Sequence, residues 1–182
     1  MGTWTGALAL AAMALATSCR PRPPETALEQ AAAGDDAAGI RQLVAQGADP
    51  NAFDSQGGTA LMSASRGGHA AAVEALVTSG ARTDLVDHRT TGWTALMHAV
   101  HKRQHQAARV LLDHGADPNA RTRGGVTALI MASAYGDTEM VRLLLDRAPD
   151  LRRGPALDRL GSWLARGRGC DEVRALLGAR PS

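Results

Sequence analysis

The chain has 182 residues, a length that suits one domain, and only 3% of them are aromatic. The formal net charge of +2 is close to neutral, so it gives no long-range attraction that would favour nucleic acid as a partner. The two cysteines, Cys19 and Cys170, are too few for a metal site built on cysteine. If Cys19 is lipidated or removed, Cys170 has no partner in the mature chain, which argues against a disulfide framework.

Residues 1–19 predict an export signal. Ala7–Ala16 is an unbroken apolar run of ten residues. It is too short to cross a bilayer, which needs about 20 residues. It has the length of a signal-peptide core, although Met1–Gly6 contains no lysine or arginine. We therefore expect the chain to be exported.

Two processing sites compete at the end of this run. Ala14-Leu15-Ala16 fits a small-x-small cleavage site, which would release a soluble exported protein. Leu15–Cys19 is similar to a bacterial lipobox, which would make Cys19 a lipid-modified N-terminus, although Ala16 stands where leucine is usual. We favour the lipobox, because Cys19 directly follows the apolar core and residues 20–26 contain a stretch of proline and arginine suited to a stiff tether. A chain that is not exported is the third alternative.

Residues 27–153 contain one sequence unit four times. The unit repeats at a fixed period of about 33 residues, which predicts a solenoid of stacked units. Its first-helix leucine recurs as Leu28, Leu61, Leu96 and Leu129, and Thr-Ala-Leu recurs from Thr59, Thr94 and Thr127. The four copies lie at about 27–56, 57–91, 92–124 and 125–153.

The third copy, residues 92–124, shows the unit most completely. Thr94 is a candidate helix N-cap, because its hydroxyl can accept a hydrogen bond from an amide left free in the first helical turn. A short helix with a small apolar inner face follows, and a second helix is predicted over Gln106–His114. Asp117-Pro118-Asn119 then predicts a turn, because Asp and Asn bond their own backbone and proline fixes φ. The apolar stripe of the second helix has helical spacing and consists of Ala107, Val110 and Leu111, with Ala108 and Leu112 flanking it.

The repeated Thr-Ala-Leu and the closing turn Gly-Ala-Asp-Pro-Asn-Ala, at Gly47–Ala52 and Gly115–Ala120, resemble the ankyrin-repeat family. The resemblance implies an all-α solenoid of stacked helix-turn-helix units with hairpin-like finger turns. The family's Thr-Pro-Leu-His becomes Thr-Ala-Leu-Met at Thr59–Met62 and Thr94–Met97, and Thr-Ala-Leu-Ile at Thr127–Ile130. These departures predict weaker local fixing of the first helical turn and leave the fold expectation intact.

Residues 154–182 predict a divergent C-terminal capping repeat. Trp163 and Leu164, followed by Val173, Leu176 and Leu177, keep the two-helix spacing. Eight arginines against four acidic residues lie between Arg147 and Arg180. We interpret this excess as the solvated face of a cap, with an anionic partner or a lipid headgroup surface as the alternative.

Catalytic and metal-binding patterns are weak in this chain. His98, His101 and His105 are spaced three and four residues apart, which could place them on one helical face for a metal. However, His98 and His101 fall where the resembling family carries variable surface residues, and His105 is expected to turn away after the first helix ends near Lys102. Cys170 has no histidine and acid nearby in the pattern that would make it a nucleophile. We therefore expect neither an enzyme nor a bound metal or cofactor.

The remaining polar residues fit structural roles. Asp35, Asp36 and Glu139 lie at predicted helix starts, where a carboxylate complements the helix dipole. Asn51 and Asn119 are predicted turn residues.

The resemblance implies that another protein binds the concave surface formed by the first helices and the finger turns. Trp93 and Tyr135 stand out in that surface, because aromatic residues and arginine are the usual binding anchors. The candidate partner-binding residues are Ser55, Gln56, Arg66, His88, Arg89, Trp93, His101, Lys102, Arg121, Arg123, Val126 and Tyr135.

The sequence thus favours a monomeric, non-catalytic protein-binding module of the bacterial envelope. We expect it to be periplasmic and anchored to a membrane through Cys19, with an envelope enzyme or a toxin as its partner and no role for nucleic acid. One alternative is a small metal-binding protein or enzyme that uses His98, His101 and His105. The other is a cytosolic ankyrin adaptor that is not exported.

Overall fold

The computed structural model describes residues 24–88, 92–148 and 175. Within these residues the regular structure is entirely helical, with one isolated antiparallel bridge between Phe53 and Thr59, so the all-α expectation is confirmed. The helices form four antiparallel pairs: α2 (Pro24–Ala33) with α3 (Ala37–Ala45), α4 (Ala60–Gly67) with α5 (Ala70–Thr78), α6 (Ala95–His101) with α7 (His105–Asp113), and α8 (Ala128–Ala134) with α9 (Thr138–Arg147).

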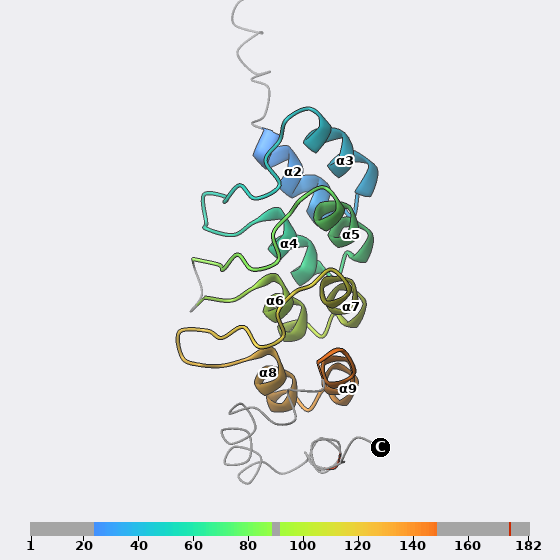
Figure 1. Ribbon diagram of the computed structural model, residues 1–182. Helices are drawn as coiled ribbons and strands as arrows, with labels where there is room; N and C mark the ends of the chain where they lie inside the picture. Colours follow the sequence, from blue (N-terminus) through green and yellow to red (C-terminus); the bar gives the residue numbers. More distant parts are fainter. Residues whose placement is uncertain (1–23, 89–91, 149–174, 176–182) are drawn as a thin grey trace, which may run out of the picture.

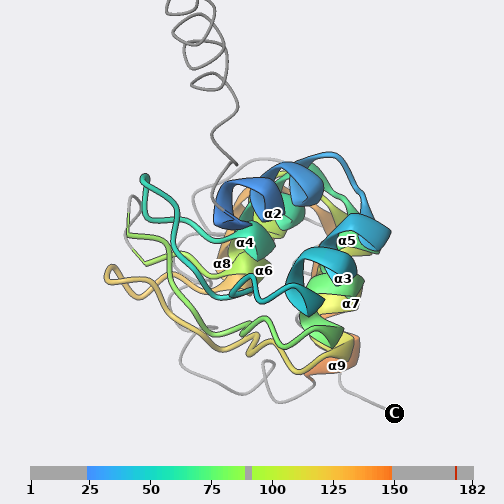
Figure 2. The ribbon, with the colours of Figure 1, turned by 90° about the horizontal axis from the view of Figure 1, so that it is seen from above.

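The four pairs stack into a solenoid (Figure 1). The first helices of the pairs form one layer, in which α4 packs against both α2 and α6, and α6 also packs against α8. The second helices form the other layer, in which α5 packs against α3 and α7. Viewed along the stack, the long connections between pairs project to one side, next to the first helices (Figure 2).

Three of the first helices begin at the predicted threonine caps. Thr59, Thr94 and Thr127 have extended backbone conformations, and each hydroxyl accepts from the amide three residues further on, at 3.3–3.4 Å. A cap of this kind contributes about 1 kcal/mol. Because each threonine ends an extended segment and starts a helix, it fixes where the chain leaves the projecting connection and enters the stack.

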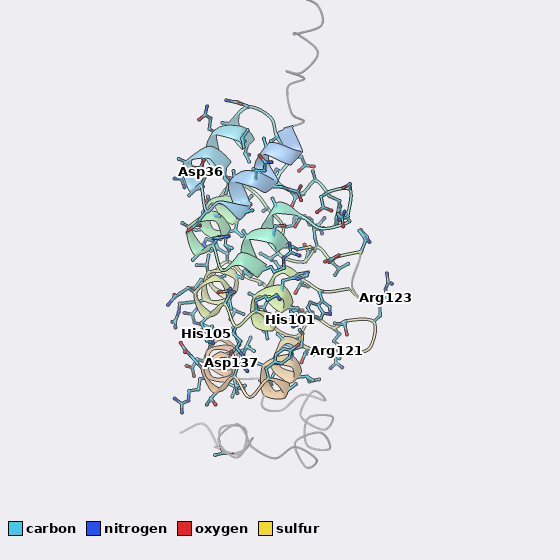
Figure 3. All side chains as sticks on the ribbon, turned by 180° about the vertical axis from the view of Figure 1, so that it is seen from behind. Asp36, His101, His105, Arg121, Arg123 and Asp137 are labelled. Carbon is cyan, nitrogen blue, oxygen red and sulfur yellow. The ribbon has the colours of Figure 1, made fainter. Side chains whose placement is uncertain are left out.

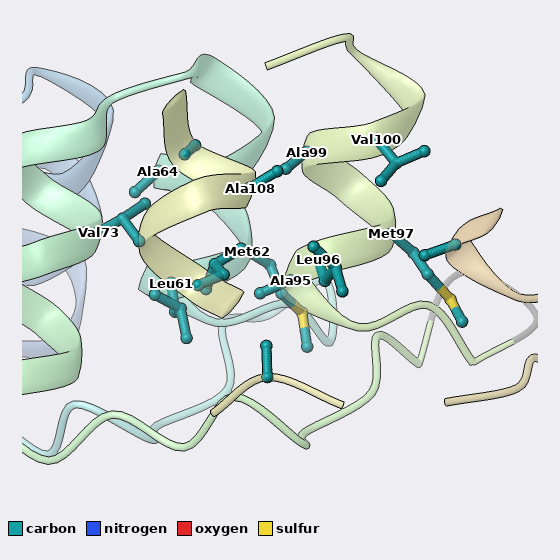
Figure 4. Close-up of a cluster of buried hydrophobic side chains, with 14 of the residues drawn as sticks. Leu61, Met62, Ala64, Val73, Ala95, Leu96, Met97, Ala99, Val100 and Ala108 are labelled. Atoms are coloured by element: carbon teal, nitrogen blue, oxygen red, sulfur yellow. The ribbon is translucent and has the colours of Figure 1, made fainter. Parts of the chain in front are cut away.

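The core lies between the two helical layers. The repeated leucines Leu28, Leu61, Leu96 and Leu129 are all buried, and the alanine three residues further on is fully buried in the last three repeats. Alanine at this position lets neighbouring helices approach closely, so few large rings are needed (Figure 4).

The second helix of the third repeat differs slightly from its prediction. α7 runs from His105 to Asp113, one residue earlier than expected. Ala108, which was predicted to flank the apolar stripe, is fully buried, whereas Val110 is half-buried and still packs against the core. The reason is that α7 packs between α5 and α9, and a helix with neighbours on two sides buries two adjacent rows of side chains.

Polar side chains tie neighbouring repeats together. Asn51, predicted as a turn residue, also reaches the next repeat: its Nδ2 donates to the Gly80 carbonyl at 3.2 Å, and its Oδ1 accepts from the Arg82 amide at 2.8 Å. On the second helices, His114 contacts Glu74 at 2.9 Å and Arg147 pairs with Asp113. Each repeat is therefore fixed to the next by hydrogen bonds as well as by apolar packing.

The described part of the chain contains no helix that is both long and apolar enough to cross a membrane. The predicted export signal with Cys19, the tether up to Pro23, and the predicted C-terminal cap apart from Ala175 lie outside the described residues.

Candidate partner-binding surface

Three hairpin-like fingers form one edge of the candidate partner-binding surface, next to the first helices. Each finger closes with a backbone hydrogen bond of 2.8–2.9 Å from an amide to a carbonyl. The amide of Asp54 donates to the carbonyl of Gly58 in the first finger, Asp87 donates to Trp93 in the second, and Thr122 donates to Val126 in the third. The acceptor residue immediately precedes the threonine cap of the following helix. The finger closure therefore sets Trp93 and Val126 at the inner base of the fingers, next to the first helices.

An aromatic cluster joins the third and fourth repeats beside these bases. The cluster consists of Trp93, His101 and Tyr135. The Trp93 and His101 rings meet edge to face with centroids 5.0 Å apart, and His101 and Tyr135 have centroids 5.5 Å apart. His101 Nδ1 and the Tyr135 hydroxyl are also hydrogen-bonded at 2.7 Å, and Arg103 donates to the Tyr135 carbonyl at 2.6 Å. The cluster is thus held in place by polar contacts from the third repeat.

A groove opens next to the aromatic cluster, with a volume of about 440 Å³. This volume falls within the range of about 300–1,000 Å³ that is common for ligand sites. The lining comes from the second finger base, the third finger and α8, and most of it is apolar. We call it the Trp93 groove; it is lined by Trp93, Thr122, Val126, Ile130, Met131, Ala134 and Tyr135.

Several residues predicted from the sequence meet at this groove. Trp93, Val126 and Tyr135 line it, and His101 contacts two of them. Arg121 and Arg123 are exposed on either side of Thr122, on the finger side of His101 (Figure 3). A side chain in place of Gly92 would touch the backbone and side chain of Arg123, which shows that the third finger lies against the second next to Trp93.

The other predicted residues lie elsewhere on the surface. Ser55 and Gln56 are exposed on the first finger, and His88 is exposed on the second, where its ring lies 4.7 Å from that of Phe53. Arg66 and Lys102 are exposed at the ends of α4 and α6. Arg89 lies outside the described residues.

The α8 side of the groove was not identified from the sequence. Ile130, Met131 and Ala134 have the i, i+1, i+4 spacing of one helical face. That spacing is visible in the sequence, but it is the same spacing that buries residues in the core. Phe53, the only phenylalanine of the chain, was also missed; it is 42% exposed and lines a second pocket of about 320 Å³ at the first finger.

The three histidines considered as a metal group do not converge on one point. His98 is buried and its Nε2 lies 3.1 Å from Asp87, so its expected surface position is wrong: the second finger folds over it. His101 contacts Tyr135. His105 faces the opposite side of the stack and lies 2.9 Å from Asp137 (Figure 3). Among the described residues, no three His, Cys, Asp or Glu side chains are placed to hold a metal ion.

One exposed ion pair lies on the segment that leads into the second finger. Arg82 donates to both carboxylate oxygens of Asp84, at 3.0 and 2.7 Å. These hydrogen bonds hold the pKa of the Asp84 carboxyl below its ordinary value. Both side chains are exposed to solvent, so the pair contributes little to the stability of the fold.

Comparison with known proteins agrees with this architecture. The family model described as ankyrin repeats (3 copies) matches residues 7–87 and 79–154, and its first match begins inside the predicted export signal. The structure is a stacked array of helix pairs with projecting fingers, and the family model matches most of the chain. Together these findings define the chain as a repeat protein. It belongs to the ankyrin-repeat family.

Similar proteins share only a short stretch with this chain. A protein of Treponema pallidum (strain Nichols), named for its ankyrin repeats, is 44% identical over 54 residues, which are 30% of this chain and 18% of that protein. The ankyrin repeat and SAM domain-containing protein 6 of Rattus norvegicus is 46% identical over 55 residues, 29% of this chain and 6% of that protein. The chain therefore matches less than a fifth of the length of each of these relatives.

Proposed function

We propose that this chain is a protein-binding module that holds one partner protein against the aromatic cluster and the fingers. Ankyrin repeats indicate a module for protein–protein interaction, which supports this proposal. The observation that carries the proposal is the aromatic cluster itself: Trp93, His101 and Tyr135 come from successive repeats, contact one another and border an open groove.

The physical character of the cluster favours protein binding. Tryptophan and tyrosine are enriched among the residues that contribute most to protein interfaces, because each combines a large apolar area with a polar group. Tyr135 is 37% exposed, yet its hydroxyl and its carbonyl are held by His101 and Arg103. A side chain that is fixed before binding loses little conformational entropy when a partner arrives.

Removing the aromatic cluster should abolish partner capture. We expect the yield of the crosslinked adduct with the partner to be at least about tenfold lower in the triple variant W93A/H101A/Y135A than in the wild type. The reason is that the loss of two aromatic anchors costs several kcal/mol of binding free energy. The measurement uses a photo-reactive amino acid at Gly124, an exposed position of the third finger where an added side chain has room, in the native host. A variant with the photo-reactive group at Arg109, on an exposed position of α7, serves as the control and should give no adduct.

Circular dichroism of the purified triple variant would show whether the fold is kept. If the triple variant folds and the Gly124 adduct still forms at the wild-type level, the assignment of the binding surface is wrong.

We further propose that the module acts in the bacterial envelope. The apolar run Ala7–Ala16 and the lipobox-like Leu15–Cys19 support export and anchoring. A bacterial relative with similar repeats is compatible with a bacterial setting. The partner would then be an envelope enzyme that the module stabilises or a toxin that it neutralises, and the module would act as a monomer without catalytic activity.

The mature N-terminus tests this location. We expect the intact mass of the chain from detergent-extracted membranes of the native host to correspond to a start at a lipid-modified Cys19. A start at Thr17 would instead indicate a freely diffusing exported protein. An intact Met1 would contradict export and would direct the search to cytosolic partners.

A further inference from the structure

We propose that the segment held in the Trp93 groove is an acidic stretch of peptide that carries one large apolar side chain. This inference rests on the proposed function and specifies the chemistry of the partner. The apolar side chain would enter the groove, and the carboxylates of the segment would face Arg121 and Arg123 on the third finger.

The size and lining of the groove favour one large apolar side chain. Of the seven lining residues, only Thr122, Trp93 and Tyr135 carry polar side-chain groups, and Thr122 already accepts a hydrogen bond from the Val126 amide at 3.0 Å. The faces of Trp93 and Tyr135 favour another ring, because an aromatic pair is stabilised by more than the apolar area that it buries. No side chain that lines the groove carries a charge.

Three arginines lie next to this groove. Arg121 and Arg123 flank the lining residue Thr122, and both are exposed. Neither forms an ion pair with another described residue. Arg103 adds a third positive charge, because its guanidinium is bonded to the carbonyl of Tyr135 at the other end of the groove. A guanidinium fork favours carboxylates, which it can bind with two hydrogen bonds at once.

The opposite end of the same face has the opposite charge. The pocket at the first finger is lined by Glu29, Asp49 and Asp54, and these are its only charged lining residues. This polarity places the acidic part of the segment at the third finger and turns it away from the first. It also argues against a nucleic acid running along the whole face, since its phosphates would meet these carboxylates.

A selection from short random peptides displayed on phage would test this inference without assuming a partner. The target is the purified full-length chain as its host processes it. We expect the enriched peptides to share two or more acidic residues next to one tryptophan, phenylalanine, tyrosine or leucine. Enriched peptides without an acidic excess would overturn the proposal. A selection that enriches no peptide would also overturn it, whether single-stranded RNA or DNA binds the same chain or nothing binds it.

Charge reversal at the groove gives the quantitative test. The affinity for the most enriched peptide, measured by fluorescence polarisation, should be at least about tenfold lower in R121E/R123E than in the wild type. The affinity of the wild type should also fall with added salt. The double variant R41E/R109E is the matched control, because it changes the net charge by the same amount at exposed positions of α3 and α7. It should bind the peptide as the wild type does; equal weakening in both double variants would reduce the effect to net charge and overturn the proposal.

The two proposals can fail separately. If R121E/R123E still crosslinks the native partner at the wild-type level in the host while W93A/H101A/Y135A does not, the aromatic cluster binds the partner and the acidic segment is wrong. If neither variant changes the adduct, the binding surface itself is wrong.

Discussion

At the scale of single residues, Asp35 shows how one repeat completes the next. Its backbone is left-handed, with φ of 56°, and its carboxylate accepts from the amide of Ala72 in α5 at 2.9 Å. The residue before α5, His69, provides no side-chain cap of its own. Asp35 therefore caps a helix of the following repeat, whereas its neighbour Asp36 caps its own helix α3 through Gly39 at 2.8 Å.

The dual role of Asp35 predicts an order of stability among its variants. Asparagine tolerates the left-handed conformation and keeps a side-chain acceptor, so D35N should be close to the wild type. Glycine keeps the conformation but loses the cap, which should cost about 1 kcal/mol. Alanine loses the cap and is strained as well, so D35A should cost about 1 kcal/mol more than D35G. Urea unfolding of the three variants gives these differences in the free energy of unfolding.

An equal stability of D35G and D35A would show that the backbone strain at this position is negligible. An unchanged stability of D35G would show that the bond to Ala72 contributes nothing.

At the scale of helices and fingers, most of the fold could be predicted from the repeat. The threonine caps and the buried leucines follow from local sequence, because a cap hydroxyl and its amide are three residues apart and the apolar positions recur with the helical period. The helix bounds of the third repeat were correct to within one residue. Local rules are sufficient here because each helix is short and begins or ends at a recognisable residue.

Contacts between repeats could not be predicted in the same way. Asp35 was expected at the start of a nearby helix, but its bond to Ala72 spans 37 residues. His98 was expected on the surface, yet the second finger folds back and buries it against Asp87. In the candidate site, Trp93 and Tyr135 could be proposed from their residue types, whereas the groove between them depends on how α8 lies against the fingers.

At the scale of the whole molecule, the packing of the described helix pairs follows their order in the stack. α2 packs against α3, α4 and α5, at one end of the described stack, whereas α6 packs against α4, α7 and α8 in its interior. In such a one-dimensional array, the stability of a repeat is approximately the sum of its own contribution and of its interfaces with the repeats beside it. A defect in α2 should therefore stay local, and a defect in α6 should spread in both directions.

The leucines of these two helices allow a matched comparison. Leu28 in α2 is 2% exposed and Leu96 in α6 is 1% exposed, and each occupies the same position of its repeat. A buried leucine replaced by alanine costs about 2–5 kcal/mol of unfolding free energy, through lost burial and the cavity left behind.

We expect L28A to raise amide hydrogen exchange in α2 and α3 while α6–α9 keep their protection, because the terminal pair can open alone. L96A should raise exchange in α4–α9, because it weakens the interfaces on both sides of the third repeat. Mass spectrometry of the exchanged peptides would measure both patterns, and a uniform rise across every helix in L28A would show instead that the stack opens only as a single unit.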